Sequence, residues 1–380
     1  MVLFVVFTTV LMCLYIAILL LYRYWFIKLQ PFVIDNTVLP LTSFTVVIPA
    51  RNEADNIEKC LTSILQQNYP TDLFEVIVID DFSTDATPTI IQQLQQNFSN
   101  LKLIKLAEML DDKQLNSYKK KAIELAIKQA QKNWVITTDA DCVAKPTWLA
   151  TYNNYIQQNK VVFVGAPVVF TNNGSVLQAF QCIDFMALQG VTAASVSAGF
   201  HAMCNGANLA FKKTVFYEVD GYKNVDAIAS GDDMFLMNKI QSKYPEKIGF
   251  LYHSNAIIST APMPTVISFL NQRIRWASKA NSYKDVRIVA ILWMMLLLNI
   301  GLTIMPFLAV FNVQILLYWA ALLLAKTLVE SAFAIKIATF FSINLQWWHI
   351  LLQIPHIVYT SLAGCFVLSG SYQWKGRKVK

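Results

Sequence analysis

The sequence predicts an α/β domain with a mostly parallel central sheet, together with transmembrane helices near both ends of the chain. Two observations predict this fold class. Short apolar runs alternate with amphipathic stretches between residues 43 and 140, which is the pattern of β-α-β units in a parallel sheet. Long apolar runs lie near each end, and a run of this kind can cross about 30 Å of hydrocarbon.

Composition supports a membrane protein. The chain has 380 residues, of which 55% are hydrophobic and 14% charged, and this is too apolar for a soluble chain of that length. The formal net charge of +7 fits an anionic membrane surface better than nucleic acid. The 6 cysteines include no C-x-x-C pair, which indicates a cytosolic domain with reduced thiols.

Residues 1–28 are predicted to form an N-terminal transmembrane anchor. The run from Val2 to Tyr22 has no charge, and it lacks the basic start and the small-residue cleavage site of a signal peptide. Arg23 and Lys28 follow it directly, so the positive-inside tendency places the next domain in the cytoplasm. We therefore expect an integral protein of a bacterial-type inner or plasma membrane.

Residues 40–285 are predicted to form the cytoplasmic domain. Its first half contains four apolar strands, predicted at 43–49, 74–79, 101–106 and 134–138. Helices between them are predicted from about 57 to 65, around 90–94, and at 119–131. This order predicts a doubly wound sheet. Its second half is expected to have helices at 148–158 and 177–196, strands at 161–169 and 248–252, and a turn followed by a strand at 204–211. Further helices are expected to open at Asp232 and Pro264.

Three acidic pairs suggest where the chemistry takes place. Asp80-Asp81 and Asp139-Ala140-Asp141 each follow a buried strand, at the edge where open α/β sheets place ligands. Asp139 and Asp141 offer the hard oxygen ligands that Mg²⁺ or Mn²⁺ takes, although a solvated turn would look the same. Asp232-Asp233 is the third pair, and simple capping of a helix is its alternative explanation. The chain has no G-x-G-x-x-G and no P-loop motif, so a nucleotide here would be held by carboxylates and a metal.

Residues 286–370 are predicted to form a C-terminal transmembrane region of two to three helices. The hydrophobic segments are 288–311, 313–341 and 347–368, and a basic tail, 371–380, follows. The middle segment contains Lys326 and Glu330, an i, i+4 pair that can neutralise itself inside a bundle. Three complete crossings would put the basic tail outside the cell, against the positive-inside tendency, so the side of the tail is left open.

Five motifs in order resemble those of the family 2 glycosyltransferases, in the membrane-bound branch with cellulose, chitin and hyaluronan synthases. They are Val46-Val47-Ile48-Pro49-Ala50-Arg51-Asn52-Glu53, Asp80 to Thr87, Asp139-Ala140-Asp141, Asp232-Asp233 and Gln272-Arg273-Ile274-Arg275-Trp276. The resemblance covers about residues 43 to 280. It implies a single nucleotide-diphosphosugar-binding domain of the GT-A type and an inverting transfer of a sugar to a hydroxyl.

The resemblance also implies residue roles on the donor side. The donor-binding residues would be Ala50, Glu53, Asp81, Lys119, Asp139 and Arg275, and the metal ligands Asp139 and Asp141. Asp81 would accept from a ring N–H, which suits uracil. Tyr118 replaces the glycine that the family usually has before the lysine, so Lys120 or Lys121 are alternatives to Lys119. Arg275 would bind diphosphate oxygens in a forked geometry.

On the acceptor side, the resemblance assigns the catalytic base to Asp233, with Asp232 as its acidic neighbour. Asn205 and Gly206 match the acceptor-side turn, where a glycine lets the backbone approach the sugar. Gln272 and Trp276 would contact the acceptor. Arg275 and Trp276 could equally form an interfacial belt at the membrane surface.

The resulting prediction is a membrane-anchored, metal-dependent, inverting hexosyltransferase. Its donor would be a nucleotide sugar, with a UDP-linked sugar expected, and its acceptor a membrane-associated lipid or glycan. One alternative is a processive polysaccharide synthase with coupled export, which the motif at 272–276 favours and the small number of crossings disfavours. An alternative of another class is an inactive membrane scaffold or nucleotide-sugar sensor. The intact acidic positions argue against it.

Overall fold

The computed structural model describes residues 1–109, 117–172, 174–225, 231–279, 283, 285–345, 347–367, 372–374 and 377–379, the backbone alone being described from residue 367 onward. These residues form two compact units. The sheet unit consists of Gln30–Thr171 and Ser195–Ala261. The helical unit consists of Met1–Leu29, Asn172–Ala194 and Pro262–Lys380. The predicted domain boundaries at residues 40 and 285 stay a prediction.

A mixed sheet forms the centre of the sheet unit. In its described part it has 7 strands in the order β3-β2-β1-β4-β7-β5-β8. They are β1 (Phe44–Ala50), β2 (Phe74–Asp80), β3 (Leu101–Lys105), β4 (Trp134–Thr137), β5 (Phe163–Gly165), β7 (Leu209–Lys212) and β8 (Ile248–Phe250). The pairs β3-β2, β2-β1, β1-β4 and β5-β8 are parallel, and β7 runs antiparallel to both β4 and β5. The predicted mostly parallel sheet is confirmed.

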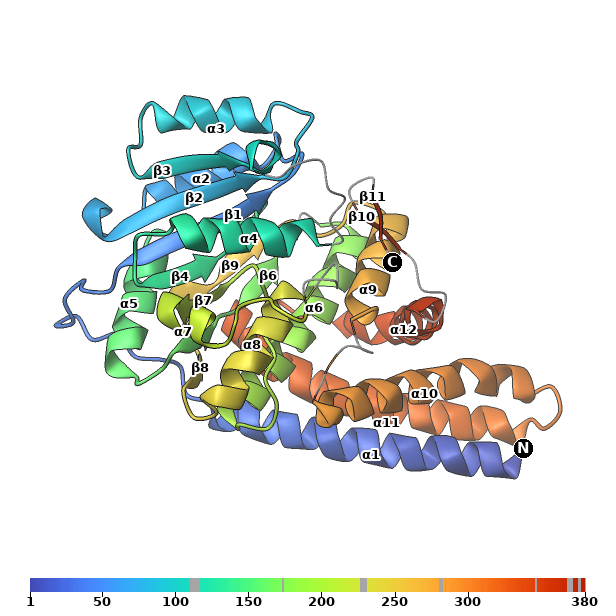
Figure 1. The fold of residues 1–380 in the computed structure, drawn as a ribbon. Helices are drawn as coiled ribbons and strands as arrows, with labels where there is room; N and C mark the ends of the chain where they lie inside the picture. The colour runs from blue at the N-terminus through green and yellow to red at the C-terminus, as the bar shows by residue number, and fades with distance from the viewer. Residues whose placement is uncertain are drawn as a thin grey trace. The chain divides into compact units, whose positions relative to one another are not determined.

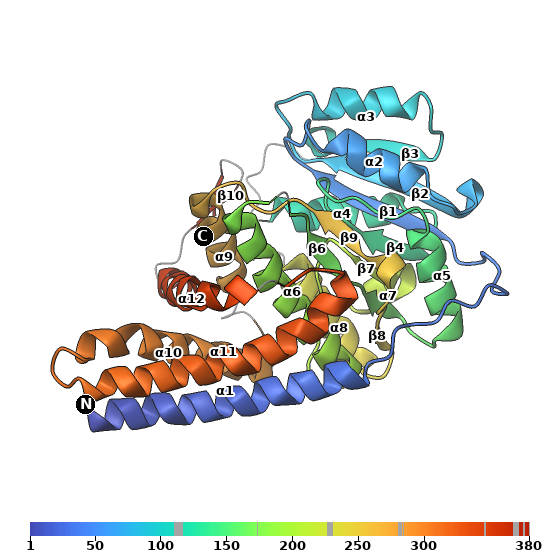
Figure 2. The same ribbon diagram turned by 180° about the vertical axis from the view of Figure 1, so that it is seen from behind.

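The interior strands β1 and β2 are buried on both faces, because helices cover the sheet from both sides. Every residue of β2 is buried, and six of the seven residues of β1 are. Figures 1 and 2, which view the sheet from opposite sides, show α4 (Tyr118–Gln129) on one face and α2 (Ile57–Leu65) on the other, with α3 (Thr87–Gln95) beside β3. A strand buried on both faces reads as a continuous apolar run, and this is why β1, β2 and β4 could be recognised from the sequence.

The predicted strand at 161–169 is two strands, which is a correction. β5 ends at Gly165, and β6 (Val168–Phe170) leaves the central sheet to pair in parallel with β9 (Ile258–Thr260). Pro167 lies between β5 and β6 and has no N–H to donate to a ladder, so the central sheet cannot continue through it. Its carbonyl instead accepts from the N–H of Ile258 (3.1 Å).

Shorter helices complete the sheet unit. They are α5 (Trp148–Gln158), α7 (Lys213–Glu218) and α8 (Asp232–Lys243), with 3₁₀ turns at Thr71–Leu73, Leu106–Glu108 and Ser254–Ala256. The helices predicted at 148–158 and at Asp232 are confirmed. α6 (Val176–Ser197), predicted at 177–196, lies mostly in the helical unit.

Three long helices dominate the helical unit. α1 (Val2–Lys28), α10 (Val286–Leu308) and α11 (Gln314–Phe341) lie side by side in both views (Figures 1 and 2). Within the described part of the chain, these 3 helices are long and apolar enough to cross a membrane. α10 and α11 correspond to two of the predicted C-terminal transmembrane helices. The predicted charge pair inside α11 is also confirmed, because Lys326 and Glu330 form a salt bridge.

The third C-terminal hydrophobic segment is not one long helix. It begins with a 3₁₀ stretch, Trp347–Leu352, and continues as α12 (Gln353–Val367), which has 15 residues. A helix needs about 20 residues to span hydrocarbon, so α12 is too short over its described residues. α12 packs against α10 and α9 (Val266–Ala277). In the predicted basic tail, Tyr372–Trp374 (β10) and Arg377–Val379 (β11) pair antiparallel, and residues 371, 375, 376 and 380 lie outside the described ones.

Candidate functional site

The carboxyl ends of β1, β2 and β4 bring the first predicted residues together. Ala50 is the last residue of β1, and its carbonyl accepts from the N–H of Asp81 (2.8 Å), which follows β2. Asp139 and Asp141 follow β4, the other neighbour of β1. Parallel strands end at one edge of the sheet, so these carboxylates share that edge because of the topology.

The loops after β1 and β2 are joined to each other by hydrogen bonds. Nη1 of Arg51 donates to the carbonyl of Asp81 (2.7 Å), and the N–H of Asn52 donates to Oγ of Ser83 (3.0 Å). Each loop contains a non-glycine residue in the left-handed region, Asn52 with φ 49° and Phe82 with φ 54°. Such residues persist where the surroundings fix the backbone, and here each loop is held by the other.

Glu53, Asp139 and Asp141 form a region of negative potential. Burial, the charge of Asp139 and the charge of Glu53 raise the pKa of Asp141 to about 6. Oδ2 of Asp141 accepts from Oγ1 of Thr260 (3.0 Å), which orients that carboxylate. The N–H of Glu53 donates to Oγ1 of Thr87 (2.8 Å). Carboxylates whose negative charges repel one another in this way are suited to share a cation.

Lys119 joins two of the acidic pairs. Its Nζ lies 2.7 Å from Oδ1 of Asp139 and 3.7 Å from Oδ2 of Asp232. Burial alone would lower the pKa of Lys119, but the charges of Asp139 and Asp232 outweigh burial and raise the pKa above its ordinary value. The neighbouring lysines point elsewhere, since Lys120 donates to the carbonyl of Val225 (2.8 Å) and Lys121 pairs with Glu124 (2.9 Å).

Asp232 and Asp233 lie in the first turn of α8. Gly231 precedes them with φ 83°, in the left-handed region. A Cβ at this position would lie 2.7 Å from the ring of Phe235, so both the backbone and the available space require glycine where the helix begins. Oδ2 of Asp233 accepts from the N–H of Gly206 (3.0 Å), and its Oδ1 accepts from the N–H of Met234 (2.8 Å). The carboxylate of Asp233 is therefore fixed by a turn from another part of the sequence.

The turn at Asn205 and Gly206 leaves space in front of both carboxylates of α8. Its own geometry is set by Oδ1 of Asn205, which accepts from the N–H of Ala207 (3.0 Å). A Cβ at Gly206 would lie 3.4 Å from Oδ2 of Asp232 and 3.5 Å from Cβ of Asp233. A side chain here would therefore lie directly against both carboxylates, and glycine leaves that space open.

Sequence reasoning missed two threonines of this site. Oγ1 of Thr137, at the end of β4, donates to the carbonyl of Gly206 (2.8 Å), so the strand that leads to Asp139 also holds the turn on Asp233. Thr260, at the end of β9, donates to Asp141. A hydroxyl at the end of a strand was the available signal, but β-branched residues are ordinary strand formers and the signal is weak.

The predicted residues Gln272, Arg275 and Trp276 belong to the helical unit, on α9. Oε1 of Gln272 accepts from Nη1 of Arg273 (3.1 Å), and the guanidinium carbon of Arg273 lies 4.2 Å from the ring centroid of Trp276. The carbonyl of Arg275 accepts from Oγ of Ser278 (2.8 Å). The roles of these three residues toward donor and acceptor stay predictions.

The carboxylates fit a divalent cation that shares its ligands with a substrate. Over the described ranges, no three His, Cys, Asp or Glu side chains gather into a metal-binding group. Mg²⁺ is commonly held by one or two carboxylates together with water and substrate phosphates, and Asp139 with Asp141 supply two. Thr260 orients one of them, and the charge of Glu53 adds to the attraction for a cation.

Comparison with known proteins agrees with this geometry. Residues 45–219 match the family model of glycosyl transferase family 2, and residues 134–362, more than half of the chain, match that of glycosyl transferase family group 2. The glycosyltransferase AglE of Haloferax volcanii is 32% identical over 156 residues, which are 40% of this chain and 48% of AglE. A poly-β-1,6-N-acetyl-D-glucosamine synthase of Staphylococcus epidermidis is 27% identical over 263 residues, 67% of this chain and 59% of the synthase. The chain spans less than two thirds of either relative.

A solved structure has the same fold. It is the mannosyltransferase PcManGT from Pyrobaculum calidifontis in complex with GDP-Man and Mn²⁺, with a TM-score of 0.56, 18% identity, and coverage of 96% of this chain and 99% of that one. This likeness and the mostly parallel sheet confirm the predicted GT-A-type fold. With both family models matched in sequence, the chain belongs to the family 2 glycosyltransferases, in the branch related to membrane-bound polysaccharide synthases.

Proposed function

We propose that this chain is an inverting glycosyltransferase at the membrane, which transfers a sugar from a nucleotide diphosphate to a hydroxyl of a lipid or glycan acceptor. The observation that carries this proposal is the pair of contacts of Lys119, which places Asp139 after β4 next to Asp232 at the start of α8. A proposed metal ligand and the acidic neighbour of the proposed base, Asp233, are thereby brought to one place. The three long apolar helices support a membrane acceptor.

On the donor side, Asp81 and Glu53 lie on the two loops that are hydrogen-bonded to each other after β1 and β2. A nucleoside inserted at this edge would meet Asp81 as an acceptor for a ring N–H, which favours a uridine nucleotide. Lys119 would contact the diphosphate. Arg275 is proposed as a second, bidentate diphosphate ligand.

Asp139 and Asp141 would hold Mg²⁺ or Mn²⁺ together with the diphosphate oxygens. A bound cation would neutralise the negative charge that develops on the leaving diphosphate. Thr260 would keep the Asp141 carboxylate oriented. The Mn²⁺ in the structurally similar mannosyltransferase supports this assignment.

Asp233 would act as the general base. In an inverting transfer, the acceptor oxygen attacks the anomeric carbon while its proton passes to a carboxylate, and the bond to the diphosphate breaks on the opposite face. The N–H of Gly206 and the N–H of Met234 each donate to one oxygen of Asp233, which holds the carboxylate in place. Asn205 and Gly206 would border the acceptor, and Gln272 and Trp276 would contact its sugar.

Replacing the base tests the proposal. The full-length protein in lipid nanodiscs is incubated with Mn²⁺ or Mg²⁺, a panel of nucleotide sugars, and either an N-acetylglucosamine trimer or an alkyl glycoside as the acceptor. We expect D233N to lower kcat by about a hundredfold or more, because a positioned base contributes that much. Nucleotide release and product mass are the measurements. Unchanged turnover in D233N would exclude Asp233 as the base.

Replacing a metal ligand tests the cation site separately. We expect D141N to raise the Mn²⁺ concentration for half-maximal activity by more than tenfold, and T260V to raise it by about tenfold, since T260V removes only an orienting hydrogen bond. Binding of Mn²⁺ in the presence of UDP is followed by electron paramagnetic resonance. If both variants bind Mn²⁺ as tightly as the wild type, the metal lies elsewhere.

A processive polysaccharide synthase is the second candidate function. The motif at 272–276 and the similarity to a poly-β-1,6-N-acetyl-D-glucosamine synthase favour it. Product mass separates the two candidates, because one added sugar per acceptor indicates a simple transferase and a ladder of masses indicates a synthase. A scaffold or sensor would bind the nucleotide sugar without releasing the nucleotide.

A further inference from the structure

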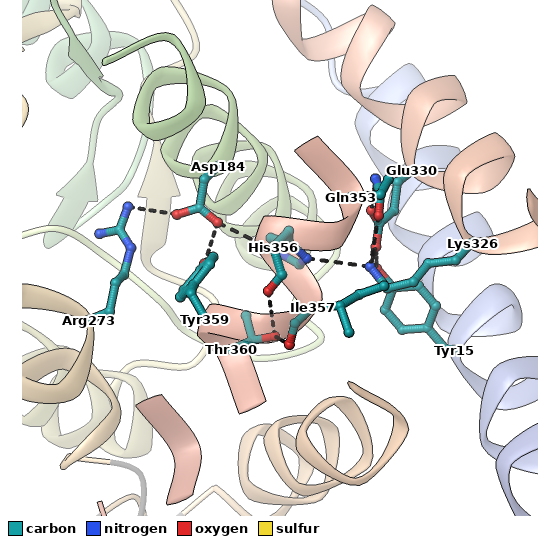
Figure 3. Close-up of polar contacts among 10 residues, drawn as sticks. All are labelled: Tyr15, Asp184, Arg273, Lys326, Glu330, Gln353, His356, Ile357, Tyr359 and Thr360. Carbon is teal, nitrogen blue, oxygen red and sulfur yellow. Dashed lines mark hydrogen bonds and ion pairs between the residues drawn. The ribbon is translucent and has the colours of Figure 1, made fainter. Parts of the chain in front are cut away.

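A second group of charged side chains lies inside the helical unit, and the proposed chemistry does not use it. Figure 3 shows this polar cluster, which consists of Tyr15, Asp184, Arg273, Lys326, Glu330, Gln353, His356 and Tyr359. It links α9 through α6 and α12 to α11 and α1. Buried charges are costly unless they are paired, and an apolar pair of the same volume is often as stable. A role in fixing particular side chains is therefore a reason to keep such a cluster.

Asp184 on α6 is the centre of the polar cluster. Its Oδ2 accepts from Nη2 of Arg273 (2.6 Å), and both side chains are only 5% exposed. Its Oδ1 accepts from the hydroxyl of Tyr359 (2.5 Å), with Nε2 of His356 at 3.6 Å. The carboxylate is thus held between α9 and α12, and it has no freedom to turn away from Arg273.

Arg273 contacts two residues that were predicted to meet the acceptor. Its Nη1 donates to Oε1 of Gln272 (3.1 Å), and its guanidinium carbon lies 4.2 Å from the ring centroid of Trp276 and 4.8 Å from that of Phe269. Arg273 and Trp276 are three positions apart on one helix, so their side chains are neighbours. A cation over an indole face is the strongest arrangement of this kind.

Trp276 has a second contact from the same turn of α6. The ring centroid of Phe185 lies 5.7 Å from that of Trp276, with an angle of 40° between the planes. Phe185 follows Asp184 directly in the sequence. Phe185 therefore contacts Trp276 directly, and Asp184 is connected to it through Arg273.

We propose that Asp184 is a positioning residue for Gln272 and Trp276, and that it acts through Arg273. Nε of Arg273 is buried and donates to no described residue, so the orientation of the guanidinium depends on the contacts of Nη1 and Nη2. Without the Asp184 carboxylate, the guanidinium loses its charged partner and its fixed plane. The inference rests on the proposed function, in which Trp276 receives the acceptor sugar.

The test is a double-mutant cycle in full-length protein in nanodiscs, with the acceptor probe that the wild type uses. D184N keeps the shape of the side chain and removes its charge. We expect it to raise the acceptor KM about tenfold while the donor KM changes less than about twofold. In a Q272A/W276A background, D184N should change the acceptor KM less than about twofold, because both residues that it positions are already gone.

A matched pair of tyrosine variants covers the case in which D184N does not fold. Y359F removes the hydroxyl that donates to Asp184, and Y15F removes the hydroxyl that donates to Glu330 at the other end of the polar cluster. We expect Y359F to raise the acceptor KM by about threefold and Y15F to leave it unchanged. Both substitutions delete one buried hydroxyl from the same unit, so a general loss of stability would affect both.

The outcomes separate the inference from the function on which it rests. If the wild type transfers no sugar from any donor in the panel, the proposed function fails. If the wild type is active but D184N changes the acceptor KM by the same factor in both backgrounds, or Y15F and Y359F behave alike, Asp184 is a structural residue and the inference is overturned.

Discussion

At the scale of single residues, Thr137 connects the strand that leads to the proposed metal ligands with the proposed base, Asp233. Its hydroxyl donates to the carbonyl of Gly206, and the N–H of Gly206 donates to Asp233. The backbone N–H and C=O of Gly206 are thus both hydrogen-bonded, the C=O to Thr137 of β4 and the N–H to Asp233. Displacing such a group by about 1 Å can lower a rate by a factor of about a hundred.

We expect T137V to lower kcat about tenfold with the donor KM nearly unchanged, and T137S to restore kcat to within about twofold. Valine has the shape of threonine without the hydroxyl, whereas serine keeps the hydroxyl. Steady-state kinetics of nucleotide release gives both parameters. Equal kcat values for T137V and the wild type would contradict the role of Thr137.

T45V is the matched control for T137V. Thr45 is also buried in a central strand, but its hydroxyl donates to Glu75 (2.8 Å). We expect T45V to lower the melting temperature and to leave kcat unchanged. A similar loss of kcat in T45V would mean that any weakened strand lowers activity.

The sequence predicted the carboxylates of the site but neither of its threonines. Asp81, Asp139 and Asp141 each follow an apolar run, and a charge at the end of a buried strand is a local signal that the sequence contains. The bonds of Thr137 and Thr260 join residues that are 69 and 119 positions apart. No local pattern contains such a contact, because it is created by the order of strands in the sheet.

At the scale of elements, β2 contains two buried carboxylates, Asp80 at its end and Glu75 near its start. Glu75 is the one that joins neighbouring strands. Its Oε1 accepts from Thr45 (2.8 Å) and from the N–H of Gln131 (2.5 Å), and its Oε2 accepts from Lys102 (2.8 Å) on β3. Burial alone would raise the pKa of Glu75, but the hydrogen bonds from Lys102, Gln131 and Thr45 outweigh burial and lower it. Glu75 therefore ties β1, β2 and β3 together through its charged form.

We expect E75Q to be destabilised by about 1–3 kcal/mol at pH 7, because a hydrogen-bonded charge is lost. Since the pKa of Glu75 is lower in the folded state than in the unfolded state, where it is about 4.3, the native carboxylate stabilises fully above that pH and loses its effect as the pH falls through its folded value. The measurement is the melting temperature of E75Q and of the wild type in detergent, taken at intervals of about one pH unit from about pH 3 to pH 7. A difference that does not narrow at low pH would contradict this account.

Elements were predictable where one local rule decided them. The strands β1, β2 and β4 are apolar on both faces, and the helices between them are amphipathic. The error at residues 161–169 came from giving the apolar run more weight than Pro167, although a proline in an interior strand argues against that assignment. The length of α12 depends on where the 3₁₀ stretch before it ends, which hydropathy alone does not indicate.

At the scale of the whole molecule, composition predicted a membrane protein but not the grouping of its segments. Residues 172–194 join α1 and the C-terminal helices in the helical unit. Most of α6 thus belongs to the helical unit, whereas the strands before and after it in the sequence belong to the sheet unit. Asp184, the centre of the polar cluster, is on this part of α6, and it was not among the predicted site residues.

The three apolar helices predict how the whole protein partitions. We expect the full-length chain to stay in the membrane pellet after washing at alkaline pH with carbonate, because each helix buries enough apolar surface to resist extraction. Immunoblotting of pellet and supernatant is the measurement. Release into the supernatant would mean that these helices pack together without crossing the bilayer.

The loops after β1 and β2, each held by the other through Arg51 and Asn52, have a consequence for changing the preferred donor. A substitution in one loop alters the support of the other, so most single changes aimed at another nucleobase should lower activity without redirecting it. Directed evolution should instead recover paired changes, one in residues 51–56 and one in residues 81–87, that are each harmful alone.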